Sequence, residues 1–192
     1  MPGPFEPRGA EDGAKLIAGH PLGWLVSRRF NASPLPLLAE TGEDGAVVAL
    51  FGHCALGNPL VADFRADPEG LILFNGPQAY VSPDLVSKPD WGPTWNYAVL
   101  RYRVEVEFVG DETGQAIERL VAAMEGDNWS TARLGPRYER MLEQIIAFRA
   151  HVRSAEPAFK LGQDESAATF GEIVRGHPDR TLAAWMEGQA KP

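Results

Sequence analysis

The sequence predicts a mixed α+β domain in which six strands form a barrel or a sandwich and helices lie between them. The first observation is a two-residue period over 98–108, where the even positions are apolar and charged residues fill 101, 103, 105 and 107. The second observation is that the same period recurs over 146–152. The third is that turn-like segments, FNAS, TGEDG and DPEG, separate the shorter apolar runs.

The strands follow from these patterns one by one. The segments 98–108 and 146–152 each have one apolar and one charged face, so we expect them to be neighbours in an antiparallel sheet with one packed face. Four shorter strands are predicted from apolar runs between turns, at 22–27, 33–39, 46–51 and 71–75.

Helices are predicted where apolar residues recur every three to four positions. The clearest is 111–125, whose acidic first turn suits the helix dipole. Its apolar stripe consists of Ala116, Ile117, Leu120, Val121 and Met124. Shorter helices are predicted at 58–66 and 136–146. Near the end, Asp164 is a candidate cap for one helix, and Pro178 can open another.

Length and composition fit one domain. The chain has 192 residues, 44% hydrophobic and 23% charged, and we divide it into a flexible N-terminal arm (1–10), a main domain (11–163) and a C-terminal helical extension (164–192). No apolar run reaches the roughly 20 residues that span a bilayer, and no secretory signal is recognised, which predicts a cytoplasmic protein without a membrane partner. The net charge of -8 argues against direct binding of nucleic acid.

Several chemistries lack their sequence patterns. The four histidines do not have the spacing of zinc ligands, so we predict no metal site, and the GxSxG, GxxxxGK[ST] and GxGxxG motifs are absent. The single cysteine, Cys54, has no partner for an intrachain disulfide. His53 precedes it, but neighbours on a strand point to opposite faces. A buried Cys54 is therefore a better interpretation than a nucleophile.

The most informative segment is 75–100, which combines prolines, glycines, aromatic rings, amides and Lys88. Its four prolines fix their own φ angles and favour extended conformations before them, so the segment is predicted to be a stiff binding loop and not a helix. Aromatic rings with polar groups, such as Tyr80, Trp95 and Tyr97, are typical linings for flat ligands or protein contacts. The alternative is that these rings cap the edge of the core.

The same segment carries a family resemblance. Residues 75–97, NGPQAYVSPDLVSKPDWGPTWNY, resemble the signature QGPHAYISPSWYxSKPxVPTWNY of the PaiB-type FMN-binding negative transcriptional regulators. The segments HPLGWLVS at 20–27, GHCALGNP at 52–59 and FRAHVRSAEPAFKLGQD at 148–164 are similar to further family motifs in the same order. The resemblance covers most of the chain, from about residue 11 to residue 177.

This resemblance implies a mainly antiparallel split β-barrel of the pyridoxamine-phosphate-oxidase-like kind, with peripheral helices and a C-terminal helical segment. It also implies a homodimer that holds FMN at the subunit interface. By motif match, the cofactor-binding candidates are His53, Asn58, Lys88, Thr94, Trp95, Asn96, Tyr97 and Lys160. The lysines would bind the phosphate and the aromatic residues would stack or form a dimer wall, while the asparagines would either donate hydrogen bonds or cap turns. No residue is assigned a catalytic role.

The chain departs from the family pattern at two positions. Leu56 stands where GHIARANP has arginine, and Ser33 stands where ATHIPLL has histidine. Leucine cannot supply the charge or the paired donors of a guanidinium. We therefore expect weaker binding of the FMN phosphate here than in members with arginine.

Three functions are compatible with these observations. The first is a cytoplasmic, dimeric regulator in which bound flavin responds to redox state or ligand, without direct DNA readout. The second is a flavin-dependent oxidoreductase of the pyridoxamine-phosphate-oxidase-like class, in which the cofactor carries the chemistry. The third is a cofactor-free dimeric interaction module in which the aromatic segment is the contact surface. In either of the first two, the ligand could also be another flat small molecule in place of flavin.

Overall fold

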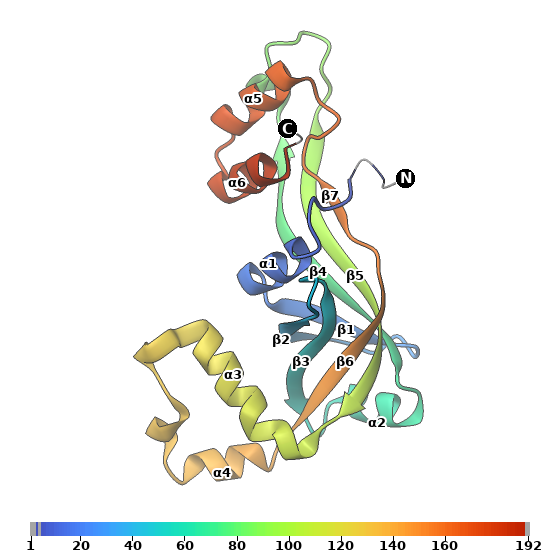
Figure 1. The fold of residues 1–192 in the computed structure, drawn as a ribbon, viewed down its shortest axis with the longest axis vertical. Coiled ribbons are helices and arrows are strands. Elements are labelled where there is room, and N and C mark those ends of the chain that lie inside the picture. Colours follow the sequence, from blue (N-terminus) through green and yellow to red (C-terminus); the bar gives the residue numbers. More distant parts are fainter. Residues whose placement is uncertain (1–2, 4, 191–192) are drawn as a thin grey trace.

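Antiparallel strands form the centre of the computed structural model, which describes residues 3 and 5–190 (Figure 1). The strands are β1 (Leu22–Ser27), β2 (Ala32–Thr41), β3 (Val47–Ala55), β4 (Glu69–Val81), β5 (Thr94–Phe108), β6 (Ile145–Ala155) and β7 (Ala158–Lys160). Their order is β4-β1-β2-β3-β6-β5-β7, and a further pairing of β4 with β5 closes β1 to β6 into a barrel. The prediction of an α+β, mainly antiparallel split barrel is confirmed.

All six predicted strands are present, and most are longer than their sequence patterns indicated. β1 has the predicted bounds, and β6 pairs with β5 as the two amphipathic segments were expected to do. The inward positions of β5 are Ala98, Leu100, Tyr102, Val104 and Val106, all buried. Phe74 from β4 and Phe148 from β6 are also buried in this core. Since burying such a side chain contributes roughly 1.5–3 kcal/mol, the barrel interior is the main source of stability.

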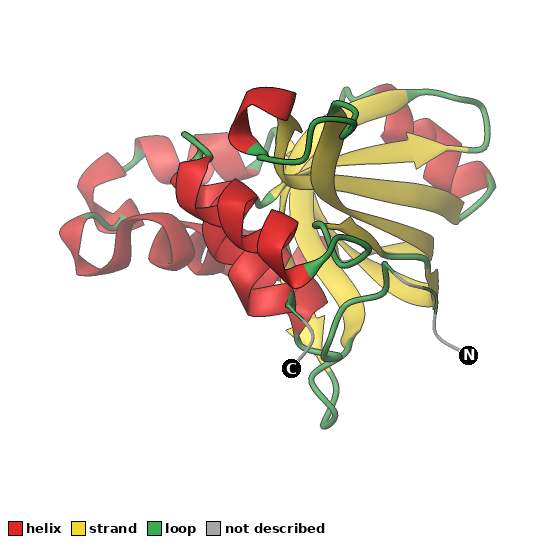
Figure 2. Ribbon diagram, turned by 90° about the horizontal axis from the view of Figure 1, so that it is seen from above, coloured by secondary structure: helices red, strands yellow, loops and turns green. Residues whose placement is uncertain are grey.

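The helices surround the barrel, and Figure 2 shows most of them on one side of the strands. They are α1 (Asp12–Gly19), α2 (Pro59–Ala66), α3 (Thr113–Glu125), α4 (Arg137–Leu142), α5 (Ala167–Gly176) and α6 (Arg180–Gln189). The sequence did not predict α1. The helix predicted over 136–146 was too long, because α4 ends at Leu142 and β6 begins at Ile145. No described helix is long and apolar enough to cross a membrane.

The cap predicted for the first C-terminal helix was wrong by two residues. Gly162 has a φ of +84°, and the Glu165 backbone N–H donates to the Gly162 carbonyl at 3.1 Å, so a turn occupies the segment that includes Asp164. The helix α5 begins only after Ser166, whose hydroxyl accepts from the backbone N–H of Thr169 at 3.2 Å.

The segment predicted to be an open binding loop is a loop only in its middle. β4 continues to Val81 and β5 begins at Thr94, so residues 78–97 form a long hairpin that extends beyond the barrel (Figure 1). We call these residues the hairpin extension. This strand pair was not predicted because prolines are disfavoured inside strands and the segment contains four of them. Pro77 lies where the register shifts between Asn75 and Gln78, a bulge that tolerates a residue without a backbone donor.

The two ends of the chain meet beside the hairpin extension. The Phe159 backbone N–H donates to the Phe5 carbonyl at 2.7 Å, and the Arg8 backbone N–H donates to Gln189 Oε1 at 2.9 Å. Gln189 is buried and donates in turn to Asp12 Oδ2 at 2.8 Å. Within the predicted arm 1–10 and extension 164–192, residues 1–2, 4 and 191–192 lie outside the described residues.

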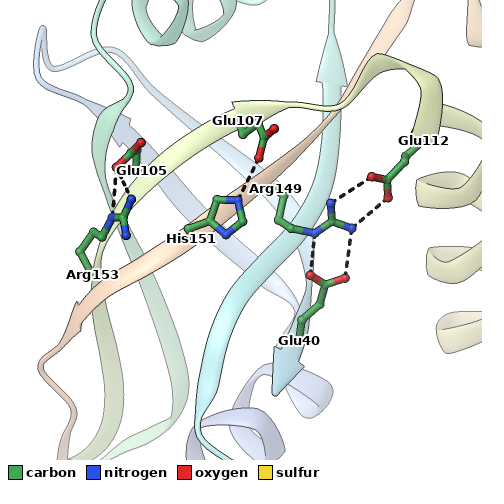
Figure 3. Close-up of polar contacts among 7 residues, drawn as sticks. All are labelled: Glu40, Glu105, Glu107, Glu112, Arg149, His151 and Arg153. Carbon is green, nitrogen blue, oxygen red and sulfur yellow. Dashed lines mark hydrogen bonds and ion pairs between the residues drawn. The ribbon is translucent and has the colours of Figure 1, made fainter. Parts of the chain in front are cut away.

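Arg149 fastens α3 to the barrel through two carboxylates (Figure 3). Its guanidinium donates to Glu40 Oε2 at 2.7 Å and to Glu112 Oε2 at 2.9 Å, and it lies 4.8 Å from the ring centroid of Phe51. Arg119 on α3 donates to Glu40 Oε1 at 2.7 Å. Burial alone would raise the pKa of Glu40, but the hydrogen bonds from the two arginines outweigh it and the net pKa is lowered.

Candidate functional site

The strand register places several of the predicted cofactor residues on one face of the hairpin extension. Tyr80 lies directly opposite Trp95, Gln78 lies opposite Tyr97, and Tyr97 lies opposite Lys160 on β7. Residues directly opposite each other in antiparallel strands share a face. These five side chains therefore point away from the C-terminal helices, and all are exposed or half-buried.

The opposite face of the hairpin extension is covered by α5 and α6. Val81 is fully buried, and Phe159 packs edge to face against Trp185 of α6, with ring centroids 5.7 Å apart. His177, between the two helices, is buried, and its Nε2 lies 3.1 Å from the carbonyl oxygen of Tyr80. These contacts hold the hairpin rigid from behind, so the exposed face has a fixed shape.

Lys160 anchors the exposed face. Its ammonium donates to Thr94 Oγ1 and, at 3.0 Å, to the carbonyl oxygen of Trp95. Both acceptors are neutral, so these bonds leave the positive charge uncompensated. The Trp95 indole N–H donates to Gln78 Oε1 at 2.6 Å, and the Trp95 and Tyr80 rings meet edge to face with centroids 6.0 Å apart.

We call this group the hairpin cluster: Gln78, Tyr80, Thr94, Trp95, Tyr97 and Lys160. Trp95 is 49% exposed and Tyr80 is 50% exposed, which is unusual for such large rings held in place by strand pairing. A cation and a hydroxyl beside two exposed rings suit an anionic group attached to a flat ring system. The amide of Gln78 adds a polar partner at the edge of the rings.

A second set of predicted residues lies at the junction of β3 and α2. Asn58 caps α2 by accepting from the Leu60 backbone N–H at 3.0 Å, and it donates to the Ser33 hydroxyl at 3.0 Å. His53 is half-buried, and its Nδ1 is buried without a hydrogen-bond partner among the described residues. Burial lowers the pKa of His53, which favours the neutral ring. Leu56 is exposed and brings no charge to this junction.

The structure does not bring the eight candidates together within one chain. α2 lies at the end of the barrel away from the hairpin extension (Figure 1), so Asn58 is far from Lys160 along the molecule. Lys88 lies in the loop at the hairpin tip, exposed and 3.8 Å from Asp90. Asn96 points to the covered face, where it is buried and donates to Met186 Sδ at 3.5 Å.

Two members of the hairpin cluster were not among the predicted cofactor residues. Tyr80 was noted only as an aromatic residue of the segment, and Gln78 was missed. The signal that could have found them is the strand register, since both lie opposite predicted residues. That register was hidden because the segment was interpreted as a loop.

Cys54 has the inert environment that the sequence indicated. It is 4% exposed inside the barrel, and burial raises the pKa of its thiol to about 11. His53 points to the other face of β3, so the two side chains do not form a proton-transfer pair.

Comparisons with known proteins identify the family. The family model described as "Putative FMN-binding domain" matches residues 1–154, so the chain belongs to this FMN-binding family. One curated relative, "Protease synthase and sporulation protein PAI 2" of Bacillus subtilis (strain 168), is 28% identical over 184 residues, which are 91% of this chain and 86% of the relative. The PaiB-type resemblance is confirmed, and the family supports FMN as the cofactor.

Solved structures share the fold. The FAD and heme binding protein from Mycobacterium smegmatis superimposes with a TM-score of 0.62 at 16% identity, covering 86% of this chain and 77% of that one. The flavocytochrome Anf3 from Azotobacter vinelandii gives a TM-score of 0.59 at 11% identity, covering 76% of this chain and 64% of that one. Both likenesses support the split-barrel architecture.

Proposed function

We propose that this chain is a homodimeric, FMN-binding regulator that responds to redox state or ligand without reading DNA directly. The observation that carries the proposal is the hairpin cluster, in which the uncompensated ammonium of Lys160 lies beside a hydroxyl and two exposed rings. The acidic chain, with a net charge of -8, favours regulation through a partner or ligand over direct contact with DNA.

The residues present fit the parts of FMN. The phosphate leaves water on binding and needs charge-assisted donors, which Lys160 and Thr94 supply. The isoalloxazine needs flat apolar cover, which Trp95 and Tyr97 supply, and amide partners such as Gln78. When bound, the flavin supplies reversible redox chemistry, and the protein holds and orients it.

Between the two predicted phosphate ligands, the surroundings favour Lys160 over Lys88. Lys88 is exposed and pairs with Asp90, so its charge is already partly neutralised. At the β3–α2 junction, Leu56 leaves the phosphate without the usual cation. We therefore assign the phosphate to Lys160 and the junction residues Asn58 and His53 to other contacts of the flavin or of the partner subunit.

The test is an FMN titration of purified protein, followed by its visible absorbance after desalting. The wild type should retain flavin bands. Lys160→Gln should weaken binding by at least about tenfold, which corresponds to ~1.4 kcal/mol. Lys88→Ala and the α1 control Lys15→Gln should stay within about twofold. A wild type that never retains FMN would overturn the proposal, and a large effect of Lys88→Ala alone would move the phosphate to the hairpin tip.

Loaded protein also separates a regulator from an oxidoreductase. The flavin-loaded wild type is mixed with reduced nicotinamide under air, and oxidation is followed over many turnovers. Slow, single-turnover reduction of the flavin would fit a sensor. Sustained oxidation of nicotinamide would replace the regulator with a flavin-dependent oxidoreductase.

A further inference from the structure

A groove of about 400 Å³ lies between α1, β2 and the C-terminal half of α3. We call it the α1–α3 groove. Its volume is within the range of pockets that bind small molecules. It shares no residue with the hairpin cluster or with the β3–α2 junction, so it is a separate feature of the molecule.

The lining of the α1–α3 groove is apolar and made largely of small side chains. Ala18 of α1, Ala39 of β2 and Ala123 of α3 all line it, and a methyl group is too short to fill the space between two helices and a strand. Met124 also lines it and is 50% exposed, although it belongs to the apolar stripe of α3. The groove therefore offers open apolar surface with an adaptable side chain at one side.

Among the described residues that line the groove, Arg119 alone is charged. Its Nη1 donates to Glu40 Oε1 at 2.7 Å, and its Cζ lies 4.7 Å from the ring centroid of Phe51. Leu38, which also lines the groove, lies directly opposite Phe51 in the register of β2 and β3. The guanidinium is therefore held in place beside the apolar lining.

The charges next to the groove alternate, and their series ends on a cation. Arg149 lies between two carboxylates, because its guanidinium donates to both Glu112 and Glu40. Glu40 in turn accepts from two guanidinium groups, those of Arg149 and Arg119. Within the described chain, Arg119 has a carboxylate on one side only. The series therefore leaves a position for one more carboxylate at its groove end.

The ion pair with Glu40 does not use up the binding capacity of Arg119. A guanidinium has five N–H donors, and the described residues accept one hydrogen bond from that of Arg119. Arg149 shows that one guanidinium in this cluster can bind two carboxylates at once. Because the side chain of Arg119 is 36% exposed, a molecule in the groove can reach its remaining donors.

We propose that the α1–α3 groove binds a small organic acid, with its carboxylate on Arg119 and its aliphatic or aromatic body along Leu38 and the alanines. The acid is a monocarboxylate, because a second charge would lie against apolar lining without a partner. The bound acid would contact α1 and α3 together. This site goes beyond the flavin site proposed above and does not depend on it.

Calorimetric titration of the full chain with octanoate tests the class of ligand. Octanoate should bind at one site per chain. Acetate has the charge without the body, octanol has the body without the charge, and octylammonium has the opposite charge, so each should bind at least about tenfold more weakly. A wild type that binds octanoate no more tightly than octanol would overturn the proposal.

Two variants place the binding in the groove. Arg119→Gln should weaken octanoate binding to the level of octanol, since it removes the charge and keeps a polar side chain. Ala123→Phe should weaken octanoate binding at least about tenfold by filling the groove, and it leaves the ion pair of Arg119 intact. Ala122→Phe is the matched control, because Ala122 is the preceding residue of α3, is equally exposed and does not line the groove.

The comparison of the two phenylalanine variants decides the location even if Arg119→Gln unfolds through loss of its ion pair. Equal octanoate affinities for Ala123→Phe and Ala122→Phe would contradict a site in this groove. Thermal unfolding of both variants, which should match, controls for damage to α3.

The same samples keep this inference separate from FMN binding. A wild type that retains FMN but does not bind octanoate would contradict the inference alone. A wild type that binds octanoate as expected but never retains FMN would contradict the proposed function and leave the inference standing.

Discussion

The barrel half and the hairpin half of β5 have similar buried faces but very different exposed ones. In the barrel, Glu105 and Glu107 point outward and pair with Arg153 and His151 of β6 (Figure 3). In the hairpin, Trp95 and Tyr97 point outward, and no element of the described chain covers Trp95. The barrel half satisfies its outward groups within the chain, whereas the hairpin half leaves apolar area that gains from a ligand or a partner.

The largest expected effect concerns β7, which pairs with β5 at the base of the hairpin extension and packs under α6. Phe159→Ala should lower the free energy of unfolding by about 3–5 kcal/mol, because it removes a fully buried ring that packs against Trp185. Urea unfolding at equilibrium measures this loss. A change below about 1 kcal/mol would show that the C-terminal helices are only loosely attached.

Trp95→Ala is the matched control on the exposed face of the hairpin extension. It should change the free energy of unfolding by less than about 1 kcal/mol, since half of the ring is already in solvent. It should nevertheless weaken FMN binding strongly. A variant that loses stability as much as Phe159→Ala would make Trp95 a structural residue and weaken its assignment to the flavin.

The next effect concerns the attachment of α3 to the barrel. The lowered pKa of Glu40 means that its ion pairs stabilise the fold above its ordinary pKa of 4.5, and this contribution is lost as the pH falls through the lowered value. Glu40→Gln should lower stability at neutral pH by about 1–2 kcal/mol and flatten the pH dependence below 4.5. Thermal unfolding between neutral and acidic pH tests this, with Glu43→Gln, an exposed turn residue, as the control.

The fold was largely predictable because its signals are local. In both β5 and β6, apolar residues occupy every second position and so form one buried face. Two strands of this kind are expected to pair, and they do. The hairpin extension was not predictable in the same way, because Pro77 and Pro93 look like loop residues until the bulge and the strand ends are known. The helices α1 and α2 both have 8 residues, but only α2 begins with a capping Asn58 and a proline, whereas Glu11 before α1 makes no side-chain capping hydrogen bond, so α1 lacks a start signal in the sequence.

The candidate site was predictable only in part, because motifs do not show which face of a strand a residue occupies or how far apart two motifs lie in the fold. Family motifs pointed to Thr94, Trp95 and Lys160, which the structure brings together across β5 and β7. Sequence position alone could not separate Asn96 from its neighbours, although alternation along a strand turns it to the covered face. It also could not show that Asn58 lies at the other end of the barrel.

Substitution of Asn96, on the covered face of the hairpin extension, should have a smaller effect on stability and none on FMN affinity. Asn96→Ala should lower the free energy of unfolding by about 1 kcal/mol, because the buried amide loses a weak hydrogen bond to Met186. Its FMN affinity should stay within about twofold of the wild type, while Tyr97→Ala, one residue along and on the exposed face, should lose affinity. A tenfold loss for Asn96→Ala would show that the flavin reaches the covered face.

The smallest effect is expected on the barrel half of β5. Glu107 is 64% exposed and pairs with a half-exposed His151 at 3.0 Å, so solvent screens most of the attraction. Glu107→Gln should therefore change the free energy of unfolding by less than about 0.5 kcal/mol and leave the FMN affinity unchanged. A loss above about 1 kcal/mol would show that the charged ladder works as one network with Arg149, and the outward face of the barrel half would then stabilise the fold as its inward face does.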